Sequence, residues 1–96
     1  MRLRKSRVAE ADLTTIADFG LDYFGVERAL AYIGAIETRC CELLVHPELG
    51  RAEQVIHSEL RSLSIGSNRI YYSIDGDDLT LRRVLHKALD VGRWLG

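Results

Sequence analysis

The sequence predicts a single α+β domain over residues 1–96, in which an N-terminal strand and an antiparallel helical hairpin precede a three-stranded antiparallel meander. Two observations predict this order. Apolar residues recur at three- and four-residue spacing in two long segments, and one glycine separates those segments. The last third then alternates apolar and polar residues around two short glycine turns. A chain of 96 residues, 47% of them apolar and 28% charged, has enough material for one modest core.

The N-terminal part is expected to form a short strand and then a long helix. Met1–Lys5 is the strand, and Ser6 is the N-cap residue of a helix over Arg7–Phe24. Gly25 then ends this helix, because glycine tolerates the positive φ that helix C-termini often need. The predicted buried stripe of the helix consists of Leu13, Ile16, Ala17, Gly20, Tyr23 and Phe24.

A second helix is predicted over Val26–Val45, ended by Pro47 and Gly50. The single glycine between the two helices makes them an antiparallel hairpin. The following residues 48–58 are expected to be an irregular connection. The buried stripe of this helix consists of Ala29, Ile33, Ile36, Cys40, Leu43 and Leu44.

Three strands should follow, over Leu60–Ile65, Arg69–Asp75 and Leu79–His86, joined by two-residue turns at Gly66-Ser67 and Gly76-Asp77. Such short turns fix the register, so that one face meets the helices. The cross-strand pairs on that face are Leu63 with Ile70, Tyr72 with Leu81, and Ile74 with Leu79. By the same alternation of side chains along the strands, Arg61 and Arg83 also belong to the face that meets the helices. The opposite, polar face carries Ser62, Ser64, Arg69, Tyr71, Ser73, Thr80, Arg82, Val84 and His86.

Charge and composition exclude several functions. Residues 10–59 hold most of the acids, and basic segments flank them, although the net charge is only −1. Neither helix has a basic face, so we expect no direct sequence-specific DNA binding. The chain has neither a phosphate-binding glycine loop nor histidines at metal-ligand spacing from the cysteines, so we expect no cofactor and no metal.

The remaining sequence features favour a cytoplasmic protein. The N-terminus has charge but no apolar signal segment, and no run of about eighteen apolar residues could span a membrane. Cys40 and Cys41 are neighbours on a helix, where side chains point about 100° apart. We therefore expect two reduced thiols, one in the core and one half-exposed.

Two segments resemble the RelE/ParE superfamily of toxins. Gly25–Arg51, GVERALAYIGAIETRCCELLVHPELGR, is similar to the second helix of the superfamily and the Pro-x-x-Gly-Arg turn after it. LRSLSIGSNRIYYSIDGDDLTLRRVLHKALD is similar to its C-terminal meander, with a Leu-Arg-x-Leu start, a Tyr-Tyr strand and an Arg-Val-Leu-His end. The resemblance covers nearly the whole chain from Ser6, and it is closest to ParE-type toxins, including the tail ending at Leu95-Gly96. It implies a RelE/ParE-like β-α-α-β-β-β fold.

The resemblance also implies a function. A ParE-type toxin belongs to a type II toxin–antitoxin system, inhibits DNA gyrase without catalytic residues of its own, and is neutralised by a ParD-like antitoxin. We therefore expect a binding protein and not an enzyme. Two alternatives remain open: a ribosome-dependent mRNA endonuclease of RelE type, and an inactive toxin that only binds its antitoxin.

For the endonuclease alternative, Arg69 and Arg82 would supply positive charge, and His86 or Tyr71 would transfer the proton. The chain has only two lysines and no tyrosine after His86, whereas the ribonuclease members carry a denser cluster, so binding is favoured. Trp94 either closes the core or anchors a partner. An apolar groove between helices and sheet is expected to take an amphipathic antitoxin helix. The candidate partner-binding residues are Arg61, Arg69, Tyr71, Arg82, Arg83, His86, Trp94 and Leu95.

Overall fold

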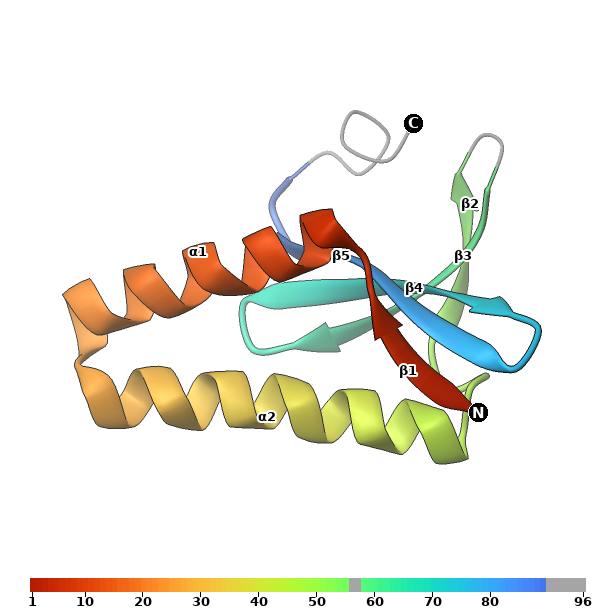
Figure 1. Cartoon of the computed structure of the whole chain (residues 1–96). Coiled ribbons are helices and arrows are strands. Elements are labelled where there is room, and N and C mark those ends of the chain that lie inside the picture. The colour runs from red at the N-terminus through yellow and green to blue at the C-terminus, as the bar shows by residue number, and fades with distance from the viewer. Residues whose placement is uncertain (56–57, 90–96) are drawn as a thin grey trace.

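The computed structural model describes residues 1–55 and 58–89 as two helices against one five-stranded sheet (Figure 1). The sheet has the order β1-β5-β4-β3-β2, with β1 parallel to β5 and the other neighbours antiparallel. The elements along the chain are β1 (Arg2–Lys5), α1 (Arg7–Phe24), α2 (Val26–Val45), β2 (Arg51–Val55), β3 (Ser58–Ile65), β4 (Asn68–Asp75) and β5 (Asp78–His86).

Both helices have the predicted bounds. The Ser6 hydroxyl accepts a hydrogen bond from the Ala9 amide at 3.0 Å, which makes it the N-cap of α1. Gly25 has a φ of 86°, so the helix ends where a glycine is required. The predicted buried stripe is wrong at its end, because Tyr23 and Phe24 are 71% and 57% exposed. The reason is geometric: the closed end of the helical hairpin extends past the sheet, so the sheet does not cover these rings (Figure 1).

The structure corrects the prediction of an irregular connection over residues 48–58. Residues Arg51–Val55 form β2, an edge strand that pairs with β3 from Arg51 opposite Ser62 to Val55 opposite Ser58. A polar edge strand has only one neighbour and little apolar alternation, so its sequence, RAEQV, carries a weak strand signal. The fold is therefore β-α-α-β-β-β-β.

The meander has the predicted tight turns, with Gly66 at a φ of 54° and Gly76 at 63°. Its predicted cross-strand pairs are confirmed: Leu63 with Ile70, Tyr72 with Leu81, and Ile74 with Leu79. Ile74 is nevertheless 40% exposed, so the prediction that it meets the helices is wrong. Ile74 lies next to the Gly76 turn, which joins β4 to β5.

A β-bulge changes the predicted faces of β5. Tyr72 pairs with Leu81 but Tyr71 pairs with Arg83, so Arg82 is an extra residue in β5. An extra residue reverses the side-chain parity beyond it. Val84 therefore joins the core, instead of the polar face, and is 3% exposed.

His86 also changes face. It lies opposite Asn68, whose side-chain oxygen accepts a hydrogen bond from the Tyr32 hydroxyl of α2 at 2.6 Å. This contact marks the helix-facing side of the sheet. His86 therefore lies on that side, and Leu85, opposite Arg69, lies on the other. The sequence pattern had placed Arg69 and His86 together.

The core lies between the helical hairpin and one face of the sheet. Its centre consists of Ala9, Ile36, Cys40, Leu43, Ile70, Tyr72, Leu79, Leu81 and Val84. This is the arrangement expected for two amphipathic helices against a sheet. The predicted stripe of α2 is confirmed by the burial of its members Ala29, Ile36, Cys40 and Leu43.

The two cysteines differ as expected, since Cys40 is buried and Cys41 is exposed. Burial raises the pKa of the Cys40 thiol to about 11, and the thiol is the unreactive form. We expect iodoacetamide at pH 8 to label Cys41 alone, and Cys40 only after unfolding in denaturant. Peptide mass spectrometry gives the site of modification. Cys41→Ser should remove all labelling of the folded protein, and rapid labelling of that variant would contradict the burial of Cys40.

Candidate partner-binding groove

An open groove of about 800 Å³ lies between the helical hairpin and the C-terminal end of β5. Its surface is mostly apolar, which is typical of sites that take an apolar side chain or helix face. At the groove, Gly20 of α1 lies so close to Ala29 of α2 that a Cβ on it would come within 3.1 Å of the Ala29 Cβ. The apolar lining residues are Ile16, Phe19, Gly20, Phe24, Ala29, Tyr32, Val84, Leu85 and Leu89.

One wall of the groove depends on an ion pair between α1 and β5. The Arg83 guanidinium donates to the two Asp12 carboxylate oxygens, at 2.8 and 2.9 Å. One of these oxygens also accepts from the Val84 amide at 2.9 Å. The side chains of Arg83 and Asp12 are only 16% and 14% exposed. The hydrogen bond that Arg83 donates to Asp12 raises the pKa of Arg83, although burial opposes this.

This ion pair lies where β5 loses its neighbouring strand. β1 pairs with β5 only from Asp78 to Leu81. Beyond that point, the Ser6 hydroxyl donates to the Arg82 carbonyl at 2.9 Å, and Asp12 accepts from Val84. Side chains of the residues that begin α1 thus satisfy the backbone groups that a strand would otherwise pair. This contact holds α1 at the edge of β5 and so shapes the groove.

The rim of the groove carries one arginine and one histidine. Arg28 of α2 and His86 of β5 both line the groove, both are exposed, and neither has an ion-pair partner among the described residues. The His86 Nδ1 accepts a hydrogen bond from the Ala88 amide at 3.1 Å. Because Asp12 is occupied by Arg83, its charge does not offset the charge of Arg28. The groove therefore favours an apolar partner segment that also carries a carboxylate.

A second polar cluster lies on the far face of the sheet, the face opposite the helices. Glu53 of β2 accepts from Ser62 and, at 2.9 Å, from Arg51. Arg69 donates to the Ser62 hydroxyl at 3.1 Å. Although burial acts in the opposite direction, these hydrogen bonds and the nearby arginines lower the pKa of Glu53. The cluster thus holds an ionised carboxylate between two guanidinium groups.

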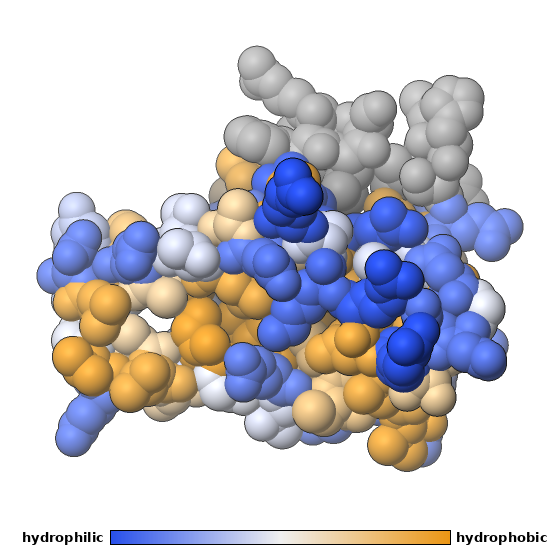
Figure 2. Space-filling model, viewed as in Figure 1, coloured by the Kyte–Doolittle hydropathy of each residue, from blue (hydrophilic) through white to orange (hydrophobic). Residues whose placement is uncertain are grey.

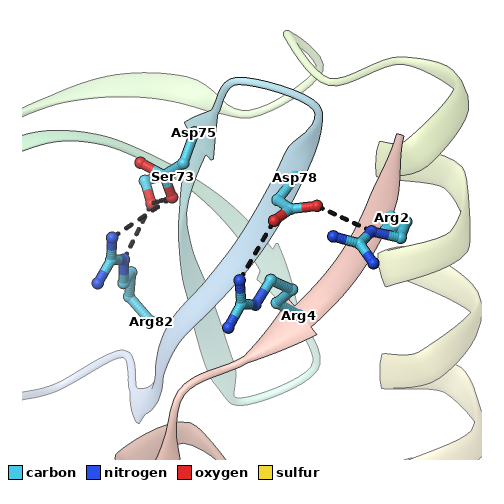
Figure 3. Close-up of polar contacts among 6 residues, drawn as sticks. All are labelled: Arg2, Arg4, Ser73, Asp75, Asp78 and Arg82. Atoms are coloured by element: carbon cyan, nitrogen blue, oxygen red, sulfur yellow. Dashed lines mark hydrogen bonds and ion pairs between the residues drawn. The ribbon is translucent and has the colours of Figure 1, made fainter.

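Two further ion-pair groups are shown in Figure 3. Arg82 donates to Ser73 at 2.9 Å and to Asp75 at 3.4 Å. Arg2 and Arg4 of β1 both contact Asp78, at 3.2 and 3.4 Å. These arginines have exposed side chains, so each pair is worth little to stability.

The structure separates the predicted site residues instead of gathering them into one site. Arg69 lies in the far-face cluster, and Arg82 is paired with Asp75. Arg83 and His86 belong to the groove. Tyr71 is only 3% exposed, and burial first, then the charge of Glu53, raises the pKa of its hydroxyl.

The other predicted contact residues fall elsewhere. Arg61 donates to the Gly50 carbonyl at 2.8 Å and holds the segment that leads into β2. Trp94 and Leu95 lie outside the described residues. Residues 1–55 and 58–89 contain no cluster of His, Cys, Asp and Glu side chains suited to a metal ion. Neither α1 nor α2, the helices of the described chain, is long and apolar enough to cross a membrane.

Sequence reasoning missed several residues that form these sites. Phe24 at the end of α1 lines the groove, as do Arg28 and Tyr32, whose spacing of four places them on one side of α2. That spacing was the available signal for Arg28. Glu53 was missed because the strand that carries it was not predicted.

A family model described as "ParE toxin of type II toxin-antitoxin system, parDE" matches residues 3–91. The chain belongs to the ParE toxin family. This membership confirms the resemblance seen in the helix and meander motifs.

Individual relatives agree with this membership. Toxin ParE1 of Mycobacterium tuberculosis is 34% identical over 89 residues, which cover 92% of this chain and 91% of that toxin. Toxin ParE1 of Caulobacter vibrioides is 29% identical over 93 residues, covering 97% of this chain and 96% of that one. A solved structure titled "Chromosomal ParDE TA system from P. aeruginosa" superposes with a TM-score of 0.77 at 24% identity, covering 90% of this ParE toxin and 95% of that chain. The last match confirms the fold.

Proposed function

We propose that this ParE toxin acts in the cytoplasm by binding and inhibiting DNA gyrase, and that a ParD-like antitoxin neutralises it by placing an amphipathic helix in the groove. The groove supports the second part of this proposal, the binding of an antitoxin helix. It joins an apolar surface of about 800 Å³ to a rim that holds Arg28 and His86. An amphipathic helix with an acidic residue beside its apolar stripe complements both features.

The placement of the predicted catalytic residues supports inhibition by binding. Phosphodiester cleavage needs an acid–base group and a cation within reach of the same phosphate. Arg69 and His86 lie on opposite faces of the sheet. Arg82 is paired with Asp75. This trio therefore does not form one site in the structure.

One observation favours the alternative of a ribosome-dependent mRNA endonuclease. The far-face cluster combines the carboxylate of Glu53 with the guanidinium groups of Arg51 and Arg69. Such a set can hold a phosphate and accept a proton. If this alternative is correct, Glu53→Gln should abolish cleavage and leave antitoxin binding unchanged.

A side-by-side assay tests the two functions. The purified toxin is added to gyrase with relaxed plasmid, and separately to translating ribosomes with a defined mRNA. We expect loss of supercoiling or accumulation of cleaved DNA with gyrase, reversal by the antitoxin, and intact mRNA. Full supercoiling at a molar excess of toxin would contradict the gyrase proposal, and mRNA cleavage that Glu53→Gln abolishes would support the alternative.

The groove is tested by reversing its rim charge. Arg28→Glu should weaken antitoxin binding at least about tenfold, because it replaces attraction by repulsion at the groove. Arg7→Glu is the matched control, since Arg7 is also an exposed helix arginine but does not line the groove. Isothermal titration calorimetry with the ParD-like antitoxin gives both dissociation constants. Equal constants for the two variants would exclude the groove as the docking site.

A further inference from the structure

The closed end of the helical hairpin exposes an unusual amount of apolar surface. Half of the large apolar side chains exposed in the described chain lie within residues 19–30. Figure 2 shows apolar surface at this end, where α1 and α2 join, and shows that it continues between the two helices. Contiguous surface of this kind usually marks an interaction site. We call it the hairpin tip, and it consists of Phe19, Tyr23, Phe24, Val26 and Leu30.

The hairpin tip is ordered by contacts among its own rings. The Phe19 and Tyr23 rings stack with centroids 4.5 Å apart, and the Phe19 and Phe24 centroids are 6.1 Å apart. These rings sit on α1 next to the turn at Gly25, whose φ of 86° suits a glycine. Rigid aromatic side chains lose little entropy on binding and are enriched among the residues that dominate binding energy.

Charge around the hairpin tip indicates the kind of partner. Asp18, Asp22 and Glu27 are exposed beside it, and none has an ion pair within the described part of the chain. Arg28 is the one cation within residues 18–30, so the three acids leave this segment with a net charge of −2. Uncompensated acids repel a phosphate backbone and attract lysine and arginine. The surface is therefore suited to a protein with an apolar socket rimmed by basic side chains, and not to nucleic acid.

The hairpin tip and the groove share two residues. Phe19 and Phe24 line the groove, and both are more than half exposed, at 55% and 57%. A helix that fills the groove would cover these rings. Tyr23, Val26 and Leu30 do not line the groove, but Tyr23 stacks on Phe19, which does. Val26 and Leu30 are therefore the positions for variants that leave the groove intact.

From these observations we propose that the hairpin tip is the surface with which the toxin binds its target protein, through an apolar socket with a basic rim. Antitoxin in the groove then blocks the target by covering Phe19 and Phe24. This inference rests on the proposed function, in that the toxin acts by binding a target.

The test uses a variant that changes the hairpin tip outside the groove, Val26→Ser with Leu30→Ser. These side chains are 60% and 67% exposed, so the fold and the antitoxin complex should persist. Val45→Ser is the matched control, because Val45 is 72% exposed at the other end of α2. Each chain is expressed in cells without antitoxin, and viable counts are taken. Each is also purified for gyrase binding, antitoxin binding and sedimentation.

We expect the Val26→Ser, Leu30→Ser chain to lose growth arrest and to bind gyrase at least about thirtyfold more weakly. Antitoxin binding should stay within about twofold of wild type, and Val45→Ser should match wild type throughout. Growth arrest that persists in the folded variant would overturn the inference. The inference would also be overturned if the wild-type toxin is a dimer and the only effect of the variant is to make it a monomer. The hairpin tip would then bind a second copy of the toxin and not the target.

The experiment also separates a wrong target from a wrong surface, and it includes a replacement variant. If the wild type arrests growth without inhibiting gyrase, the proposed target is wrong, but loss of arrest in the variant still supports the hairpin tip. If the double variant fails to bind antitoxin, Asp22→Lys replaces it as a single exposed charge reversal. Asp22→Lys should weaken target binding about tenfold, and unchanged growth arrest in that variant would overturn the inference.

Discussion

Replacing Asp12 with alanine is expected to lower the free energy of unfolding by about 3 kcal/mol. The carboxylate accepts two hydrogen bonds from Arg83 and one from the Val84 amide, and its side chain is only 14% exposed. Its removal leaves a mostly buried guanidinium and a backbone amide without their acceptor. A loss of this size lowers the melting temperature of a domain this small by about 12 °C or more, as differential scanning calorimetry would show.

Two control variants show how much of this loss of stability comes from the burial of the Asp12–Arg83 pair and how much from its charge. Asp78→Ala removes the acceptor of Arg2 and Arg4, whose side chains are 80% and 66% exposed, and should cost about 1 kcal/mol or less. Asp12→Asn keeps one acceptor for the Val84 amide and should fall between the two alanine variants. A melting temperature for Asp12→Ala equal to that of Asp78→Ala would contradict the role given to the Asp12–Arg83 pair.

Local sequence signals predict most of this fold because the structure follows them closely. The cap at Ser6, the glycine between the helices and the two glycine turns each act over a few residues, and each is found in the structure. β2 has no such signal of its own. Tertiary contacts fix its position: the Tyr72 hydroxyl and the Arg61 guanidinium hold the segment from Pro47 to Gly50, which leads into it.

The candidate site was harder to predict because one inserted residue redistributes it. Regular alternation along β4 and β5 predicts that Arg69 and His86 share one face of the sheet. The bulge at Arg82 instead moves His86 to the face that meets the helices. A bulge of this kind depends on how β5 meets α1 through Asp12, which lies some seventy residues earlier in the sequence. The groove and the hairpin tip likewise depend on how far the helices extend past the sheet. Apolar periodicity cannot show this, so it predicted that Tyr23 and Phe24 are buried.

Replacing Tyr72 with phenylalanine is expected to lower the free energy of unfolding by about 2 kcal/mol, although the ring would still fill the core. The Tyr72 hydroxyl donates to the Pro47 carbonyl at 2.7 Å and accepts from the Gly50 amide at 2.9 Å. Gly50 stays closely packed in the variant, because a Cβ on it would lie 2.7 Å from Cε1 of the ring and 2.8 Å from the Ser62 carbonyl oxygen. Both backbone groups would lose a hydrogen bond where the chain enters β2. Hydrogen exchange of the β2 amides should therefore increase together with the loss of stability.

The neighbouring tyrosine supplies the control. Tyr71 is 3% exposed and Tyr72 is fully buried, but no hydrogen bond links the Tyr71 hydroxyl to the described residues, so Tyr71→Phe should cost less than about 1 kcal/mol.

The stability lost in Tyr72→Phe should also depend on pH. Burial raises the pKa of Tyr72 in the folded state, so its contribution is complete below about pH 10 and is lost as the pH rises through the raised value. The difference in stability between wild type and Tyr72→Phe, measured by urea unfolding, should therefore be constant from pH 7 to 9 and shrink at higher pH. A difference that grows above pH 10 would show that the hydroxyl is not held as a neutral donor to Pro47.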